Sequence, residues 1–237
     1  YENLLNIIYY VNKKSEIANT AGFFVNGYLV PYEYYNEILN TENIKFWSHL
    51  NNYESNNLYS LADDYIKLFN QNNADKKILM GHSRGGAVVA LANAIEKKSN
   101  NNNNYNYGCI LIDPVDDSEL STINEIKSLK NNNRDNSRLN FSPTLIISTS
   151  WGGQSKYYNT KYESSCAPPK RAALAFIDAY KETYQLSPQL LSFSQSSIFN
   201  DKSLIYVHLP EIGHLDILVQ PPSLSPLTIR GVCATSP

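Results

Sequence analysis

The chain has 237 residues, which suits one large α/β domain or two small ones, and we expect a single domain over residues 1–237. Its formal net charge of −2 provides no basic stripe of the kind that nucleic acid requires, so no nucleic-acid partner is expected. No apolar run approaches the roughly 20 residues that span a bilayer, so no transmembrane segment is expected, and only peripheral association with a membrane stays open.

Neither the N-terminal sequence nor the cysteines indicate a cellular compartment. The chain begins without an initiator Met and without the basic segment of a signal peptide, so we expect a segment of a longer product. Three cysteines, Cys109, Cys166 and Cys233, are too few and too dispersed for a disulfide framework or a zinc site. Buried or free thiols are the first expectation, and a single Cys166–Cys233 bridge is the alternative. No metal or cofactor is expected.

Strand-like and helix-like segments alternate along the chain. In chain order the patterns predict strands at 7–11 and 22–25, a helix at 34–39, a weak strand at 44–47, a helix at 58–69, a strand at 78–80, a helix at 87–97, strands at 109–112 and 144–148, a helix at 172–180 and a strand at 204–209. Asn-rich stretches near 99–106 and 130–137 predict solvated loops. This alternation favours a mainly parallel sheet with helices on both faces. In such a sheet the catalytic and binding residues lie in the loops that follow the carboxyl ends of the strands.

The stretch Gly81-His82-Ser83-Arg84-Gly85 lies between a predicted strand and a predicted helix. A serine in G-x-S-x-G at such a turn is held in a strained conformation, and the glycines remove Cβ atoms that would clash with the strand and the helix. The helix that follows directs free N–H groups at whatever binds there. A turn that merely contains a serine is the alternative. We predict that Ser83 is a catalytic nucleophile.

A serine nucleophile needs a histidine that accepts its proton. His214 follows the last predicted strand in a Gly-containing loop, where such a base belongs, and it is the predicted base. His82 lies inside the turn and is expected to support it, His49 lies in an Asn-rich loop, and His208 lies within a strand.

The histidine in turn needs an acid that fixes its tautomer, and this acid should follow another strand. Asp113 ends the strand at 109–112 and gives the chain order Ser, Asp, His of the fold, so it is the predicted acid. Asp116 and Asp117 compete with it, although solvation of the loop suits them better. Asp216 is close to His214 along the chain and suits a helix cap.

Acyl transfer also needs donors for the developing oxyanion. We predict the backbone N–H of Arg84, directly after the nucleophile, and the backbone N–H of Tyr28, in the Asn26-Gly27-Tyr28 loop after the strand at 22–25. The Asn-Gly pair could equally form a hairpin turn. The helix-like stretch that follows favours the oxyanion loop.

These motifs resemble the chlorophyllase family of α/β-hydrolases. The resemblance is carried by Gly-His-Ser-Arg-Gly-Gly at 81–86, Asp-Pro-Val at 113–115, Ser-Cys-Ala-Pro at 165–168 and Gly-His-Leu-Asp at 213–216, in that order. The stretch Phe-Phe-Val-Asn-Gly-Tyr at 23–28, followed by Tyr34-Tyr35, is similar to the family's first oxyanion segment. The resemblance implies the triad Ser83, Asp113 and His214, and hydrolysis of the phytyl ester of chlorophyll without a metal. A true chlorophyllase would belong to the plastid.

The chain also departs from the family. Asn26 replaces the family's usual His in the oxyanion loop, residues 169–173 lack the usual Asn-His, and extra polar residues lie at 131–136. These departures concern the substrate more than the triad. A general carboxylesterase or lipase with the same triad, and a non-catalytic binding protein of the same fold, are the alternatives.

Aromatic side chains suggest an apolar ester as the substrate. They gather in loops after two strands that should border Ser83, and they are Tyr28, Tyr32, Tyr34, Tyr35, Trp151, Tyr157 and Tyr158. Flat rings with a polar edge suit a wide macrocycle. Ordinary core or surface positions are the alternative for them.

Overall fold

The computed structural model describes most of the expected domain. The residues it describes are 20–28, 30–40, 45–47, 57–99, 107–132, 141–149, 167, 169–186, 189–190, 204–209, 213–215 and 218. The strand predicted at residues 7–11 lies outside them, as do Cys166, Cys233, His49 and Asp216.

The centre of the molecule is a parallel sheet. Within the described residues it has seven strands in the order β2-β1-β3-β4-β5-β7-β6, and every pair of neighbours runs parallel. The strands are β1 (Thr20–Val25), β2 (Lys45–Trp47), β3 (Lys76–His82), β4 (Tyr107–Ile112), β5 (Thr144–Thr149), β6 (Gln189–Leu190) and β7 (Leu204–Leu209). Parallel neighbours require crossover connections, and these bring all carboxyl ends to one edge of the sheet. The predicted parallel α/β architecture is confirmed.

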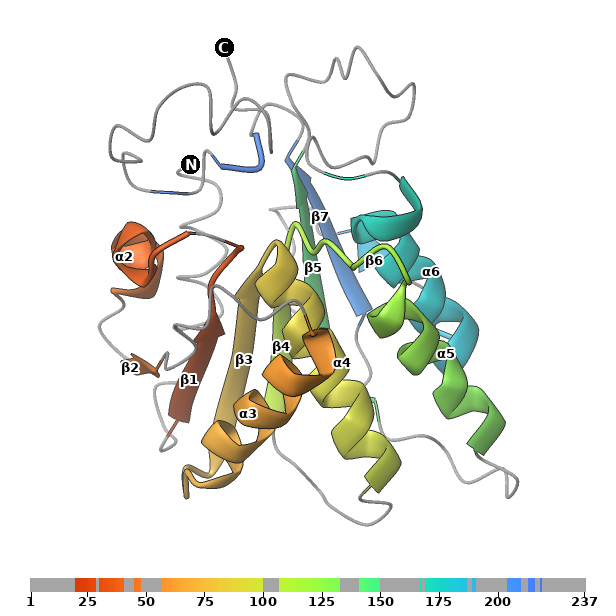
Figure 1. The fold of residues 1–237 in the computed structure, drawn as a ribbon, viewed down its shortest axis with the longest axis horizontal. Helices are drawn as coiled ribbons and strands as arrows, with labels where there is room; N and C mark the ends of the chain where they lie inside the picture. Colours follow the sequence, from red (N-terminus) through yellow and green to blue (C-terminus); the bar gives the residue numbers. More distant parts are fainter. Residues whose placement is uncertain are drawn as a thin grey trace.

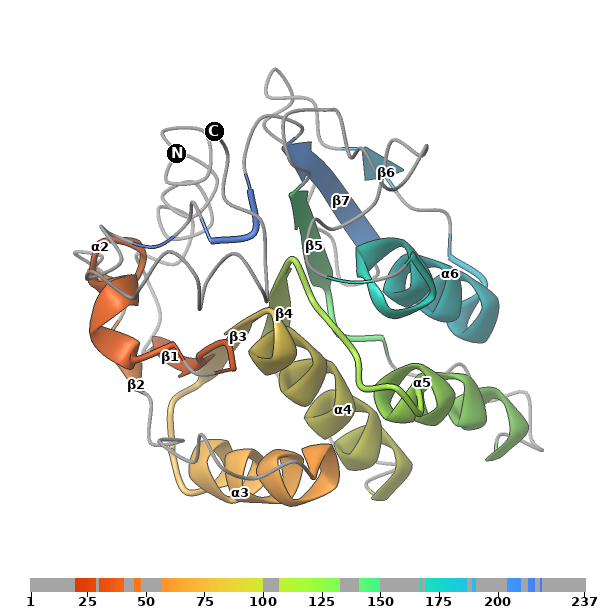
Figure 2. The ribbon, with the colours of Figure 1, turned by 45° about the horizontal axis from the view of Figure 1, so that its top comes forward.

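The helices are divided unequally between the two faces of the sheet. They are the 3-10 helix η1 (Tyr32–Tyr35), α2 (Asn36–Leu39), α3 (Leu58–Asn70), α4 (Arg84–Ser99), α5 (Ser121–Asn132), the 3-10 helix η3 (Pro169–Arg171) and α6 (Ala173–Tyr184). Figure 1 shows α3 to α6 side by side across one face, and the turned view of Figure 2 shows α2 on the other side. Within the described residues, both faces therefore carry helices, as predicted.

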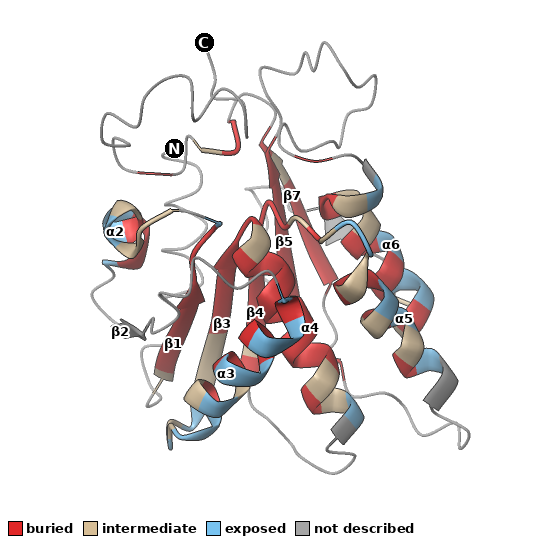
Figure 3. Ribbon diagram, in the orientation of Figure 1, coloured by how far each residue is buried: buried red, intermediate tan, exposed pale blue. Residues whose placement is uncertain are grey.

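Burial on both faces explains why the strands read as continuous apolar runs. One core cluster joins β1, β3, β4, β5 and β7 to the inner sides of α3 to α6, and a second joins the opposite face to Tyr35, Ile38 and Leu39. In Figure 3 the central strands are mostly red, apart from tan segments such as the start of β3, whereas α3 and α6 are red only toward the sheet. Helix α4 is buried over residues 85–94, and its small side chains let it lie between α3, α5 and the sheet.

Helix α5 is the main element that the sequence prediction missed. It begins after two aspartates that accept its first N–H groups: Asp117 Oδ1 accepts from Ser121 N at 2.9 Å, and Asp116 Oδ2 accepts from Ile123 N at 2.9 Å. The prediction that these aspartates merely solvate a loop was wrong, because both cap a helix. The helix continues through Asn132, so the predicted loop near 130–137 begins later than expected.

Candidate active site

Ser83 lies at the turn between β3 and α4, with a backbone φ of 56°. An L-residue avoids this left-handed region unless its surroundings hold it there. The neighbouring backbone does so: Ser83 N donates to the carbonyl oxygen of Ile112 at 2.9 Å. The Ser83 carbonyl accepts from the N–H groups of Gly86 and Val115, each at 3.0 Å. The strained conformation is therefore fixed by β4 and by the first turn of α4.

The two glycines of the turn allow the strand and the helix to approach closely. A Cβ atom added to Gly81 would overlap the backbone of Gly85, and one added to Gly85 would overlap the carbonyl oxygens of Val25 and Asn26. Both clashes involve backbone atoms, which a side-chain adjustment cannot relieve. A strained serine between two such glycines, at the carboxyl end of a central parallel strand, has the backbone geometry of a nucleophile elbow, and its catalytic role stays a prediction. The chain has the α/β-hydrolase fold.

Asp113 and His214 meet at the same edge of the sheet. Asp113 directly follows β4, and its N–H donates to the carbonyl of Ile147 on β5 at 2.6 Å. His214 follows β7, and its Nδ1 donates to Oδ2 of Asp113 at 2.5 Å across 101 positions of sequence. Both side chains are almost completely buried. The structure thus brings the predicted acid and base together at the carboxyl edge of the sheet, the edge at which Ser83 also lies. Their catalytic roles stay a prediction.

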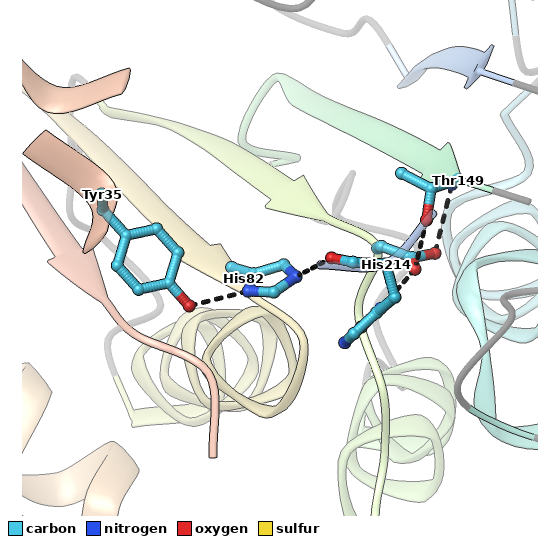
Figure 4. A network of polar contacts seen from close by, with 5 residues as sticks. Tyr35, His82, Thr149 and His214 are labelled. Carbon is cyan, nitrogen blue, oxygen red and sulfur yellow. Dashed lines mark hydrogen bonds and ion pairs between the residues drawn. The ribbon is translucent and has the colours of Figure 1, made fainter. Parts of the chain in front are cut away.

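Thr149 is a polar partner of this pair that the sequence did not indicate. It is the last residue of β5, and its hydroxyl donates to Oδ2 of Asp113 at 2.6 Å while its N–H donates to Oδ1 at 3.3 Å. Figure 4 shows Thr149 and His214 on the same cluster of polar contacts. The available signal was a threonine at the carboxyl end of a buried strand. It was hidden because threonine is also a common strand residue.

The competing acids lie elsewhere. The side chains of Asp116 and Asp117 bind N–H groups at the start of α5. The backbone of Asp116 also exchanges two hydrogen bonds with Arg171. Asp116 N donates to the carbonyl oxygen of Arg171, and Arg171 Nε donates to the carbonyl oxygen of Asp116 at 2.8 Å. Burial raises the pKa of the Asp116 carboxyl. Asp216 is outside the described residues, so its expected capping role stays a prediction.

The other described histidines have different surroundings from His214. His208 lies within β7, and its ring stacks on that of Tyr206 with centroids 6.4 Å apart. His82 is fully buried between two segments: Nδ1 lies 2.8 Å from the hydroxyl of Tyr35, and Nε2 lies 3.0 Å from the carbonyl oxygen of His214. Burial, followed by the nearby His214, lowers the pKa of His82 well below its usual value. The neutral form of His82 is therefore favoured at neutral pH, in keeping with a supporting position.

The loop after β1 lies directly against Ser83. A Cβ atom on Gly27 would be 3.4 Å from Cβ of Ser83. The loop is closed by Asn26 Nδ2, which donates to the Val30 carbonyl at 2.6 Å, and by Val30 N, which donates to the Gly27 carbonyl at 3.2 Å. The chain then enters η1 and α2, and β1 pairs in parallel with β2 and β3, so the alternative of a hairpin turn is excluded.

The predicted oxyanion donors flank the serine. Arg84 is the first residue of α4, and Tyr28 follows Gly27 in the loop. Their side chains also meet, because the Arg84 guanidinium carbon lies 5.2 Å from the centre of the Tyr28 ring. This cation–π contact links the loop after β1 to the start of α4 through side chains. The donor role of both N–H groups stays a prediction.

The aromatic side chains expected around the site have different surroundings. Tyr28 is 44% exposed, and Tyr32 packs edge-on against Phe24. Tyr35, expected to border the substrate, is instead 0% exposed and belongs to the core below the loop. Trp151, Tyr157 and Tyr158 lie outside the described residues.

The described residues contain neither a candidate metal-binding cluster nor a candidate membrane span. In the part of the chain that the structure describes, no group of three or more His, Cys, Asp or Glu side chains could hold a metal ion. No helix among the described residues is long and apolar enough to cross a membrane.

Cys109 is a buried free thiol on β4, and burial raises its pKa to about 12. Any Cys166–Cys233 bridge falls outside the described residues.

Comparison with known proteins gives distant structural likeness only. No family model and no curated protein sequence matches the chain. A solved structure described as a YdeN-like hydrolase from Pectobacterium atrosepticum SCRI1043 is 11% identical, with a TM-score of 0.45, over 94% of this chain and 93% of that one. A structure of RedJ, with a polyethylene glycol molecule bound in its active site, is 11% identical, with a TM-score of 0.49, over 87% of this chain and 86% of that one.

Proposed function

We propose that the chain is a serine hydrolase of carboxylic esters, with Ser83 as nucleophile, His214 as general base and Asp113 as the acid that orients His214. The observation that carries the proposal is the hydrogen bond from His214 Nδ1 to Asp113. With the hydrogen on Nδ1, Nε2 of a neutral imidazole is the nitrogen that can accept a proton. The strained backbone of Ser83 supports the nucleophile role independently.

The proposed reaction has two halves. Ser83 Oγ attacks the ester carbonyl carbon while its proton moves to Nε2 of His214, and the resulting imidazolium is stabilised by the Asp113 carboxylate. The tetrahedral intermediate expels the alcohol, which takes the proton from His214 and leaves an acyl-enzyme on Ser83. Water then attacks the acyl group with His214 again as base, and the acid is released as Ser83 regains its proton.

The negative charge on the carbonyl oxygen needs fixed donors during both attacks. We assign them to the backbone N–H groups of Tyr28 and Arg84. The contact of the Gly27 loop with Ser83 supports this assignment, as does the position of Arg84 at the start of α4, where unpaired N–H groups favour an anion. Loss of one such donor typically costs about 10²- to 10³-fold in kcat.

For the substrate we propose a large apolar ester, and specifically a phytyl ester of the chlorophyll type. The proposal rests on the resemblance of four motifs in register to the chlorophyllase family, and on the exposed ring of Tyr28, which lies against the side chain of Arg84, the residue after Ser83. Such a substrate is membrane-borne, so peripheral association with a membrane belongs to the same proposal. A plastid location would accompany it.

The proposal is tested by assaying the purified protein on chlorophyll a, pheophytin a and a short p-nitrophenyl ester, with the Ser83→Ala variant as control. Release of chlorophyllide and phytol by the wild type, absent in the variant, is the expected result. Cleavage of the short ester alone would reject the chlorophyll substrate and leave a general esterase. Equal rates for wild type and Ser83→Ala would reject Ser83 as the nucleophile, and a wild type that cleaves none of the substrates would reject the hydrolase itself.

A further inference from the structure

A continuous series of buried hydrogen bonds joins the loop after β1 to the segment after β7 by way of His82, the residue before Ser83. Gly27 N donates to the hydroxyl of Tyr35 at 2.9 Å, this hydroxyl lies 2.8 Å from His82 Nδ1, and His82 Nε2 lies 3.0 Å from the carbonyl oxygen of His214. Figure 4 shows Tyr35, His82 and His214 following one another across the carboxyl edge of the sheet. The first and last members of the series are backbone atoms, one in the oxyanion loop and one at the proposed base.

The chemistry of the end groups fixes the direction of every bond. A carbonyl oxygen can only accept, so Nε2 of His82 carries the hydrogen and donates to His214. Neutral His82 then accepts at Nδ1, and Tyr35 must be the donor there. The Tyr35 oxygen in turn accepts from Gly27 N–H. All three bonds therefore point the same way, and each buried polar atom among them has a partner of the required kind.

We propose that Tyr35 and His82 are positioning residues that hold the oxyanion loop and the His214 turn at a fixed separation across Ser83. The inference rests on the proposed ester hydrolysis, because it assigns to these residues the alignment of that site. Neither side chain acts on the substrate. Tyr35 acts through Gly27, next to the donor Tyr28, and His82 acts through the main chain of His214.

The oxyanion loop packs closely against Tyr35 and His82. A Cβ atom on Gly27 would lie 3.1 Å from both Nδ1 of His82 and the hydroxyl of Tyr35. The Tyr35 and His82 rings pack at 5.6 Å, and the His82 and His214 rings at 4.6 Å, between centroids. Apolar packing alone could fill this space with a phenylalanine at position 35. That phenylalanine would lack the hydroxyl that links Gly27 N to His82 Nδ1. A Tyr35→Phe variant therefore distinguishes a positioning role from simple filling of the core.

The test compares Tyr35→Phe with Tyr107→Phe in hydrolysis of a short p-nitrophenyl ester. Tyr107 begins β4 at the opposite edge of the sheet, is also buried, and donates its hydroxyl to Asn93 Oδ1 at 2.8 Å. Each variant removes one buried hydroxyl, so their melting temperatures should fall to a similar extent. Tyr35→Phe should lose roughly 10- to 100-fold in kcat with KM nearly unchanged, because the oxyanion loop is displaced. Tyr107→Phe should keep the wild-type kcat.

Equal kcat values for the two variants would overturn the inference while leaving the proposed function intact. A wild type that hydrolyses no ester would instead reject the proposed function. In that event, nuclear magnetic resonance of the imidazole nitrogens decides the inference: His82 should be protonated at Nε2 only, and Tyr35→Phe should shift the Gly27 amide and His214 resonances. Unshifted resonances in that variant, or a proton on Nδ1 of His82, would overturn it.

Discussion

Thr149 donates its hydroxyl hydrogen to Oδ2 of Asp113 at 2.6 Å, and the same oxygen accepts from Nδ1 of His214. The carboxylate is thereby held from β5 on one side and from the segment after β7 on the other. Hydrogen bonds to an ionised acceptor are about twice as strong as neutral ones. Thr149 therefore fixes the direction in which Asp113 presents its charge to His214.

Replacing Thr149 by valine tests this relationship, because valine keeps the shape and removes the hydroxyl. We expect the free energy of unfolding to fall by about 1.5–3 kcal/mol and kcat to fall by roughly tenfold. Thr149→Ser, which keeps the hydroxyl, should retain most of the activity. Urea unfolding and steady-state kinetics on a short ester measure both effects, and equal kcat values for the two variants would contradict the role of the hydroxyl.

Asp113→Asn and Asp116→Asn form a matched pair of buried substitutions. Asp113→Asn should lower kcat about 10⁴-fold, because the amide no longer favours the required tautomer of His214. Asp116→Asn should keep near-wild-type kcat but lose about 1–3 kcal/mol of stability, because its amide nitrogen would face the N–H of Ile123. The reverse pattern of activities would assign the acid to Asp116.

His214→Ala and His208→Ala distinguish the two histidines near the end of the sheet. Loss of a triad member typically costs several powers of ten, so His214→Ala should be about 10⁴-fold or more slower in kcat. His208 lies within β7 and stacks on Tyr206, so His208→Ala should change stability more than activity. An active His214→Ala with an inactive His208→Ala would assign the general base to His208.

The lowered pKa of His82 predicts a pH dependence of stability. The His82 ring contacts Tyr35 and His214. Burial is the largest cause of the lowered pKa. Because the folded state binds this proton less tightly than the unfolded state, the stabilisation is complete above about pH 6.5 and is lost as the pH falls below that value. His82→Gln should therefore show a shallower loss of unfolding free energy between pH 6.5 and 5, by up to about 1.4 kcal/mol per pH unit. Equal slopes in urea titrations of both proteins would contradict this.

Much of the fold could be predicted from the sequence because its strands are buried on both faces and read as apolar runs. The strand before Ser83, the helix after it and the parallel arrangement all followed from that pattern. Helix α5 was missed because its start is marked by Asp116 and Asp117, whose capping cannot be told from loop solvation without geometry. Its two terminal asparagines also resemble the polar loops elsewhere in the chain.

The meeting of Asp113 and His214 could be predicted from their positions after two strands, because parallel strands end at one edge. The contacts of Thr149 and Tyr35 could not, since they depend on strand register and on which face each side chain occupies. Thr149 pairs with Leu209 at the ends of β5 and β7, which puts it beside the site. Tyr35 lies in a short 3-10 helix, whose docking against His82 has no periodic sequence signature.

Covalent labelling of the intact protein by a fluorophosphonate, followed by mass spectrometry of the modified peptide, tests directly whether Ser83 is the nucleophile. Only an activated serine reacts at a useful rate, so one rapid adduct is expected, on Ser83. The adduct should be absent in Ser83→Ala and much slower to form in His214→Ala. A wild-type protein that stays unlabelled, or an adduct that forms on another serine at an undiminished rate in Ser83→Ala, would show that Ser83 is not the nucleophile.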